Sequence, residues 1–215
     1  MPAQQRVIEE LLAHEGRTYA QEAGIRLADT PQPLYRTLVL SCLLSARIRS
    51  SIAVATSRAL ADAGLRDARS MAQSGRQERV DALGRGGYRR YDERTATQLG
   101  EGAQLILDEW GGDLRRLRKQ ADGDLTALRR QLQRVPGLGP TGADIFLREV
   151  QAIWPEVAPY LDPKVVQGAR RLGLPEDEAA LSRLAEDKGP AAFAAALVRA
   201  ALDKKMAEGY RRQAV

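Results

Sequence analysis

The sequence predicts a protein built from α-helices, and three observations lead to that prediction. Apolar residues recur at the three- and four-residue spacing of a helix along most of the 215 residues, and no segment of useful length alternates as a strand does. Aromatic residues are only 5% of the chain, which favours packed helices over a β-sandwich. Hydrophobic residues at 44% and charged residues at 28% are typical of a folded globular protein.

The first half of the chain is predicted to contain a buried central helix among shorter ones. A first helix carries an apolar face that begins at Val7. Residues 34–45 are apolar around most of the helix circumference, so this segment is predicted to be central. Pro31 and Pro33 precede it, where proline can start a helix but not continue one. Further helices are predicted at about 50–63, 68–71, 76–83 and 91–110.

The second half is predicted to be helical around one sharp interruption. Asp124 is a predicted N-cap, and Pro163 occupies a predicted first helical position. The interruption is Val-Pro-Gly-Leu-Gly-Pro-Thr-Gly at 135–142. The predicted helices are 113–119, 124–134, 143–150, one beginning at Pro163, 175–186 and 190–207.

The interruption at 135–142 is the segment most informative about function. Glycines spaced by one apolar residue allow positive φ and close backbone approach, and they stand between a finishing helix and a starting one. Such a turn directs backbone N–H groups and a helix N-terminus at one point, which suits a phosphate oxygen. A tight helix–helix turn without a ligand explains a bare Gly-Leu-Gly equally well.

Composition excludes several classes of site. The single cysteine, Cys42, excludes an intrachain disulfide and any cluster held by several thiolates, and one histidine argues against histidine-rich metal sites. No apolar run is long enough to span a bilayer, and residues 1–14 contain acidic residues instead of the basic and apolar regions of a signal peptide. We therefore expect a cytoplasmic protein without a membrane partner. Residues 26–91 hold twelve arginines and five acidic residues, an excess of seven positive charges that suits a phosphate-facing surface.

Four segments, in order, carry a resemblance to a known family. They are Leu-Leu-Ser-Ala-Arg at 43–47, Gly-Tyr-Arg-Arg-Tyr-Asp-Glu-Arg-Thr-Ala at 87–96, the interruption with its flanks at 132–143, and Tyr-Leu-Asp at 160–162. Together they resemble the helix-hairpin-helix base-excision DNA glycosylases, of the endonuclease III type. The resemblance implies an all-α, two-lobed fold. A six-helix barrel at 30–150 would contain the helix-hairpin-helix at about 128–148, and residues 1–29 and 151–215 would form the second lobe.

The resemblance also implies the chemistry of the site. Asp162 falls at the position of the family's catalytic aspartate, whose carboxylate stabilises the oxocarbenium character of the sugar. The alternative for Asp162 is a helix N-cap ahead of Pro163. Thr141 stands where lyase members carry a lysine, which implies a monofunctional enzyme that uses water. Lys164 is an alternative amine, although a solvated or phosphate-facing charge explains it more simply. The cysteines of the family's iron–sulfur cluster are absent.

Further residues are assigned to DNA by the same resemblance. Arg47 stands where the family places the residue that fills the gap left by a flipped nucleotide, and it could equally contact a phosphate. The hairpin is expected to hold a phosphate, with a monovalent cation on its carbonyls. Tyr160 and Tyr88 are expected at the base pocket, although core packing also explains Tyr88. The expected DNA contacts are Gly137, Leu138, Gly139, Thr141, Arg47, Arg49, Arg89 and Arg90.

The predicted function is therefore excision of a damaged base from duplex DNA by hydrolysis of its N-glycosidic bond, by a monomer. An alternative of another class is a catalytically silent DNA-binding or damage-sensing protein that kept the fold. Recognition of RNA or branched DNA through the same hairpin is a third possibility.

Overall fold

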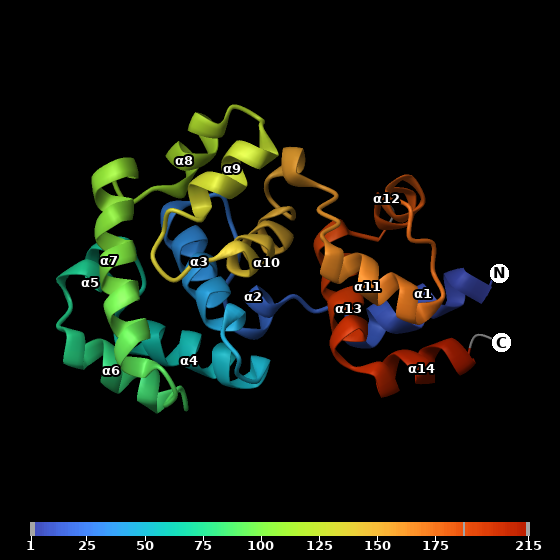
Figure 1. Ribbon diagram of the computed structural model, residues 1–215, viewed down its shortest axis with the longest axis horizontal. Helices are drawn as coiled ribbons and strands as arrows, with labels where there is room; N and C mark the ends of the chain where they lie inside the picture. The colour runs from blue at the N-terminus through green and yellow to red at the C-terminus, as the bar shows by residue number, and fades with distance from the viewer. Residues whose placement is uncertain (1–2, 187, 214–215) are drawn as a thin grey trace. The chain divides into compact units, whose positions relative to one another are not determined.

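A computed structural model describes residues 3–186 and 188–213, and within these ranges the chain forms helices and connecting loops without a strand (Figure 1). The predicted all-helical class is confirmed. In chain order the helices are α1 (Ala3–Glu15), α2 (Tyr19–Glu22), α3 (Pro31–Ser45), α4 (Ser50–Asp62), α5 (Ala68–Gln73), α6 (Arg76–Arg85), α7 (Asp92–Trp110), α8 (Leu114–Ala121), α9 (Leu125–Leu132), α10 (Pro140–Val150), the 3₁₀ turn η1 (Pro155–Val157), α11 (Pro163–Leu172), α12 (Glu178–Glu186), α13 (Pro190–Leu202) and α14 (Lys204–Gln213).

The chain divides into two compact units, one of residues 20–147 and one that combines 1–19 with 148–215. The division follows the same pattern as the predicted lobes, with both chain ends in one unit. Its first boundary lies ten residues earlier than the expected position 30, and its second lies three residues earlier than 150. The unit 20–147 therefore begins within α2, a one-turn helix that the apolar pattern did not predict.

In the unit 20–147, α3 is the central helix, as its apolar circumference predicts. A second, unpredicted anchor is the buried Arg79 of α6. Its guanidinium donates to the carbonyl oxygens of Met71, Ser74 and Ala96 at 3.2, 2.6 and 2.7 Å, so it ties the end of α5 to α7. Hydrogen bonds to several carbonyls make this buried guanidinium tolerable, although no described carboxylate forms an ion pair with it. Burial nevertheless lowers the pKa of Arg79.

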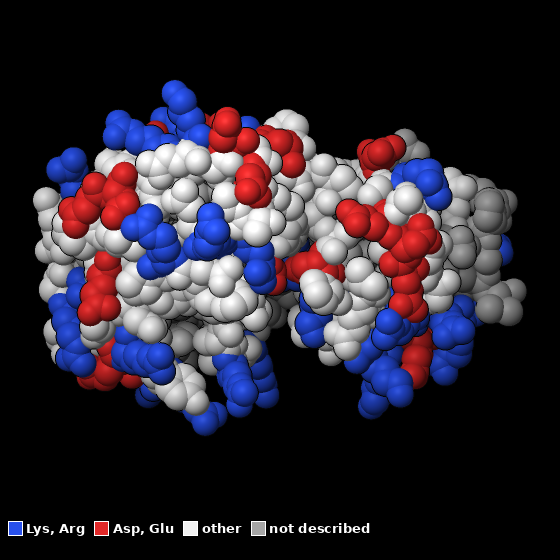
Figure 2. All heavy atoms as spheres, turned by 45° about the horizontal axis from the view of Figure 1, so that its top comes forward, with Lys and Arg blue, Asp and Glu red and all other residues white. Residues whose placement is uncertain are grey.

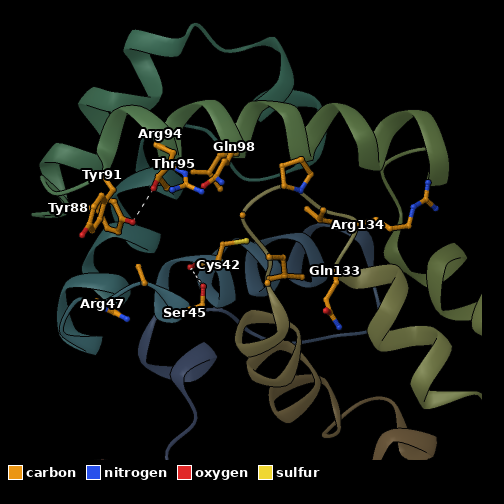
Figure 3. Close-up of a pocket in the computed structure, with 17 residues that line it drawn as sticks. Cys42, Ser45, Arg47, Tyr88, Tyr91, Arg94, Thr95, Gln98, Gln133 and Arg134 are labelled. Carbon is orange, nitrogen blue, oxygen red and sulfur yellow. Dashed lines mark hydrogen bonds between the residues drawn. The ribbon is translucent and has the colours of Figure 1, made fainter.

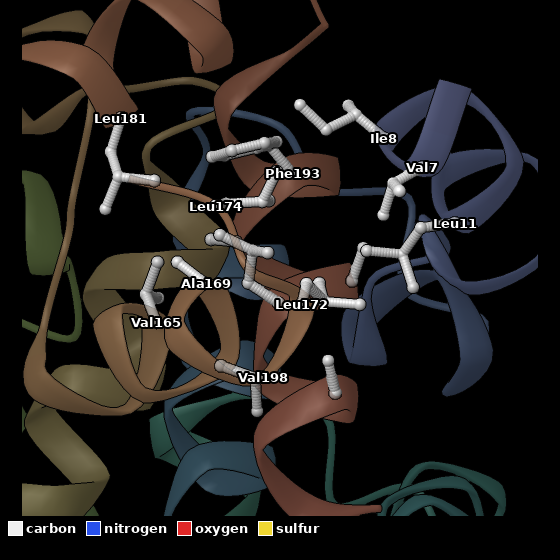
Figure 4. Packing of buried hydrophobic residues seen from close by; sticks show 14 of the residues in the cluster. Val7, Ile8, Leu11, Val165, Ala169, Leu172, Leu174, Leu181, Phe193 and Val198 are labelled. Carbon is white, nitrogen blue, oxygen red and sulfur yellow. The ribbon is translucent and has the colours of Figure 1, made fainter. Parts of the chain in front are cut away.

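The second unit packs α1, α11, α12, α13 and α14 around one apolar cluster (Figure 4). Gly168 of α11 lies directly against the backbone of Leu197 in α13, where no larger residue fits. The buried cluster includes Val7, Ile8, Leu11, Val165, Ala169, Leu172, Leu174, Leu181, Phe193 and Val198.

The predicted single helix at 190–207 is wrong, because two helices, α13 and α14, occupy that segment. Asp203 adopts φ −117° and ψ 99°, which is not helical, and its Oδ1 accepts the N–H of Met206 at 2.9 Å. Aspartate competes for backbone donors in this way and so favours a helix start over a helix interior. The helix predicted at 143–150 begins earlier, at Pro140, where the fixed φ of proline suits a first helical position.

Candidate functional site

The loop that joins α9 to α10 is a tight turn held by its own backbone. The N–H of Val135 donates to the carbonyl of Leu132, and the N–H of Leu138 donates to that of Val135, both at 3.0 Å. Gly137 has φ +84°, a left-handed conformation that favours glycine. The side chain of Leu138 is buried, and the absence of a side chain at Gly142 makes room for it, since a methyl group there would lie 2.8 Å from Leu138 Cδ1.

This geometry leaves backbone polar groups of the loop exposed. Gly137 and Gly139 are both exposed, and within the described part of the chain nothing accepts a hydrogen bond from their N–H groups. Gly139 precedes α10 and has no side chain with which to cap it, so the N-terminus of α10 keeps free N–H groups. An ion pair also links the two helices, because Arg129 of α9 donates to both carboxylate oxygens of Asp144 of α10 at 2.7 and 3.2 Å.

A pocket of about 670 Å³ lies beside this loop, entirely within the unit 20–147. Its walls are the end of α3 with the loop after it, the start of α7, and the α9–α10 loop (Figure 3). No aspartate or glutamate is among its lining residues. The lining includes Gly137, Leu138, Gly139, Arg47 and Tyr88 from the predicted set. The structure thus brings these five together on one surface.

The arginines of the pocket differ in whether they have partners. Arg47 and Arg94 are exposed and make no ion pair or hydrogen bond with any residue of 3–186 or 188–213. Arg134 also lines the pocket, but it pairs with Glu109 at 3.0 Å and its guanidinium stacks 5.5 Å from the ring centre of Trp110. Two cations are therefore available to an anion in the pocket.

The other predicted arginines lie outside the pocket lining. Arg49 and Arg89 are exposed, and Arg90 stacks 5.0 Å from the ring centre of Tyr91. On the face shown in Figure 2, basic side chains gather along the lower edge of the part that holds α3 to α10, with acidic ones among them.

Two tyrosines stand at the pocket in different environments. Tyr88 is 3% exposed and its hydroxyl lies 3.0 Å from Thr95 Oγ1, so it is both a packed residue and a wall of the pocket. Tyr91 is 47% exposed and has φ +69°, which is uncommon for a residue with a side chain. Its backbone caps the start of α7.

Sequence reasoning missed three lining residues of this wall, Arg94, Thr95 and Gln98. A signal was present, because together with Tyr91 they recur at the three- and four-residue spacing of one helix face.

Cys42 also lines the pocket. Burial raises the pKa of its thiol to about 12, so the thiol stays protonated at neutral pH.

Asp162 belongs to the other unit and is 7% exposed. It is the N-cap of α11, where its Oδ1 accepts the N–H groups of Lys164 and Val165 at 2.8 and 3.0 Å. Its Oδ2 accepts Nη1 of Arg148 at 2.9 Å. The geometry is that of the N-cap alternative, and Arg148 adds an ion pair that no sequence signal indicated. The catalytic role of Asp162 stays a prediction.

The remaining predicted residues are not among the lining residues of the pocket. Lys164 is exposed and its Nζ donates to Gln167 Oε1 at 2.9 Å. Tyr160 is buried in the same unit as Asp162, and its N–H donates to Gln151 Oε1 at 2.8 Å. Thr141 is exposed in the first turn of α10 and is not a lining residue.

Known proteins and common cofactor patterns give no further assignment. No protein-family model and no curated protein matches this chain. The described side chains contain no group of three or more His, Cys, Asp or Glu residues suited to a metal. Of the helices in the described ranges, none is both long and apolar enough to cross a membrane.

Proposed function

We propose that the chain is a DNA-binding protein of the helix-hairpin-helix base-excision type, acting in the cytoplasm as a monofunctional glycosylase. In this proposal α9, the loop and α10 are the helix-hairpin-helix, and the two units correspond to the two lobes of that fold. One observation carries it. A pocket without acidic lining combines a glycine turn with two arginines, Arg47 and Arg94, that have no partner among the described residues.

The DNA backbone would be held by this pocket and its loop. The exposed N–H groups at Gly137 and Gly139 and the uncapped start of α10 suit a phosphate oxygen, because the helix terminus carries partial positive charge. Arg47 and Arg94 would neutralise further phosphates. These contacts fix the position of a duplex without reading its sequence.

The proposal includes a monovalent cation at the same loop. The carbonyl oxygens of Gly137 and Leu138 accept no hydrogen bond from any described residue. These oxygens would hold the cation, which would supply positive charge between the loop and a phosphate.

The proposed chemistry rests on Asp162. Breaking an N-glycosidic bond develops positive charge on the sugar, which a nearby carboxylate stabilises, and the same group can accept a proton from the attacking water. The N-terminus of α11 fixes Oδ1, so Oδ2 would be the reacting oxygen, and Arg148 must share it. Thr141 supplies no amine, so the product would be an intact abasic site.

The test is a panel of duplexes that each carry one damaged base, with each reaction split into samples with and without hot alkali. Strand cleavage only after alkali, abolished by Asp162→Asn, is the expected result. Asp113→Asn is the matched control, because Asp113 also caps a helix, α8, and pairs with an arginine, Arg115, at 2.7 Å. Cleavage without alkali would contradict the monofunctional assignment and implicate Lys164.

One observation favours a second candidate, the catalytically silent binder. Both carboxylate oxygens of Asp162 are engaged, by two backbone N–H groups and by Arg148, as in a purely structural cap. If no lesion yields product while salt-sensitive duplex binding is tight, the silent binder replaces the glycosylase.

A further inference from the structure

The side-chain amide of Gln98 is a polar group of the pocket that the proposed phosphate contacts do not use. Gln98 lies on α7, is half-buried, and faces the α9–α10 loop (Figure 3). A methyl group at Gly137 would stand 3.3 Å from Gln98 Oε1, which shows how closely the amide approaches the loop. Neither the oxygen nor the nitrogen of this amide has a hydrogen-bond partner in the described ranges.

The surroundings of this amide are partly apolar, and Arg94 lies one helical turn away on α7. Leu99, Val135 and Pro136 line the same wall, and the Cys42 thiol beside them is protonated. The hydroxyl of Tyr88 is already paired with Thr95. A ligand that displaces water here must satisfy the amide itself, because an unpaired polar group in a dry site is costly.

A nucleobase fits these requirements. Its edge presents a donor and an acceptor in one plane, which a glutamine amide can match with two hydrogen bonds. Tyr91, which is 47% exposed and carries Arg90 against its ring, offers an aromatic side chain on which a base can stack. The volume of about 670 Å³ lies in the range of roughly 300–1,000 Å³ that small ligands occupy.

We propose that Gln98 is a specificity-determining residue that reads the hydrogen-bonding edge of an unpaired base of the bound DNA. The inference rests on the proposed DNA binding, but not on excision. The unpaired base lies in the pocket with its phosphates toward Arg47 and Arg94, and Gln98 distinguishes one base from another by its donor and acceptor pattern.

Gln133 provides a matched control on the opposite wall. It lines the same pocket, but its Nε2 donates to the carbonyl of Arg129 at 3.2 Å, so its amide is partly committed to α9. Replacing either glutamine by methionine keeps the length and flexibility of the side chain and removes only the amide. Comparing Gln98→Met with Gln133→Met distinguishes a specific loss of base recognition from the general effect of removing an amide from the pocket.

The experiment measures dissociation constants for four duplexes in which one abasic-site analogue faces A, C, G or T, and for one fully paired duplex. The wild-type protein is expected to prefer one base by about tenfold, the size of one well-formed pair of hydrogen bonds. Gln98→Met should reduce that preference to about twofold, while Gln133→Met should keep it. Thermal melts of both variants establish that they are folded.

Two results would overturn the inference while duplex binding stands. One is a wild-type protein that binds all four abasic duplexes equally, and the other is a Gln98→Met variant that keeps the preference or weakens all four duplexes alike. Failure of the wild-type protein to bind any duplex, the fully paired one included, would overturn the proposed function and this inference together.

Discussion

The two regions on which the proposal rests differ in whether their charged side chains are exposed and unpaired or buried and paired. In the pocket of the unit 20–147, Arg47 and Arg94 are exposed and have no partner among the described residues. In the other unit, Asp162 is buried and engaged by Arg148 and by two backbone N–H groups. An exposed arginine without a partner can bind an anion without breaking an existing ion pair. A buried carboxylate that is already paired must lose its partner before it can interact with a ligand, which costs free energy. The proposed binding surface is therefore preformed, whereas the proposed chemistry would require Asp162 to give up its ion pair with Arg148.

Replacing Arg148 by methionine should have the largest effect on stability. It leaves Oδ2 of Asp162 buried without its partner, and breaking a buried pair from one side costs about 3–5 kcal/mol. Urea unfolding measures the loss. Arg129→Met is the control, since its pair with Asp144 is more exposed and should cost about 1 kcal/mol or less. Equal losses of unfolding free energy in the two variants would show that the Arg148–Asp162 pair is no more important to the fold than a partly exposed pair.

Replacing Gly137 by alanine should damage the pocket region next most strongly. The left-handed backbone at φ +84° costs a residue with a Cβ about 1–2 kcal/mol, and the new methyl group crowds Gln98. Both unfolding free energy and duplex affinity should fall. Gly139→Ala is the matched control, because a Cβ there meets open space and its φ is not positive. If Gly137→Ala changes neither the unfolding free energy nor the duplex affinity, binding does not depend on the left-handed conformation of this turn.

Removing one unpaired arginine should weaken binding without affecting the fold. For Arg47→Met or Arg94→Met we expect a several-fold loss of duplex affinity and a decrease of about 1 in the slope of log affinity against log salt. Arg134→Met should leave the slope unchanged, because Arg134 is held by Glu109 and Trp110. Fluorescence anisotropy titrations at several salt concentrations test all three, and an unchanged slope in the first two variants would contradict the pocket assignment.

The smallest expected effect concerns the other capped aspartate, Asp113. Its hydrogen bond with Arg115 lowers the pKa of the Asp113 carboxyl, so the carboxylate stabilises the fold at neutral pH, and that stability is lost as the pH falls through the depressed pKa. Because asparagine caps a helix about as well as aspartate, Asp113→Asn removes mainly the ion pair with Arg115; it should cost about 0.2–1 kcal/mol at pH 7, and the difference from wild type should shrink below about pH 4. Unfolding at a series of pH values measures it, and a difference independent of pH would show that the carboxylate charge contributes nothing.

The sequence by itself determined the helical class and most helix positions, because periodicity and capping are local properties. Asp124 and Pro163 stand at helix starts as predicted, whereas α3 begins at Pro31 and not after Pro33, and residues 133–139 separate α9 from α10. The same local evidence did not find the break at Asp203, since an alanine-rich helical pattern runs up to Asp203 and a charged helical pattern follows it.

Only the tertiary structure decided how the candidate site is assembled. Arg148 meets Asp162 across fourteen residues of chain, and Gln98 of α7 meets Gly137 of the loop across thirty-nine, neither at a spacing that helix periodicity can register. Whether an arginine is paired, as Arg134 is, or left without a partner, as Arg47 is among the described residues, depends on which helices pack beside it. Composition supplied the charges, and packing decided which of them a ligand can use.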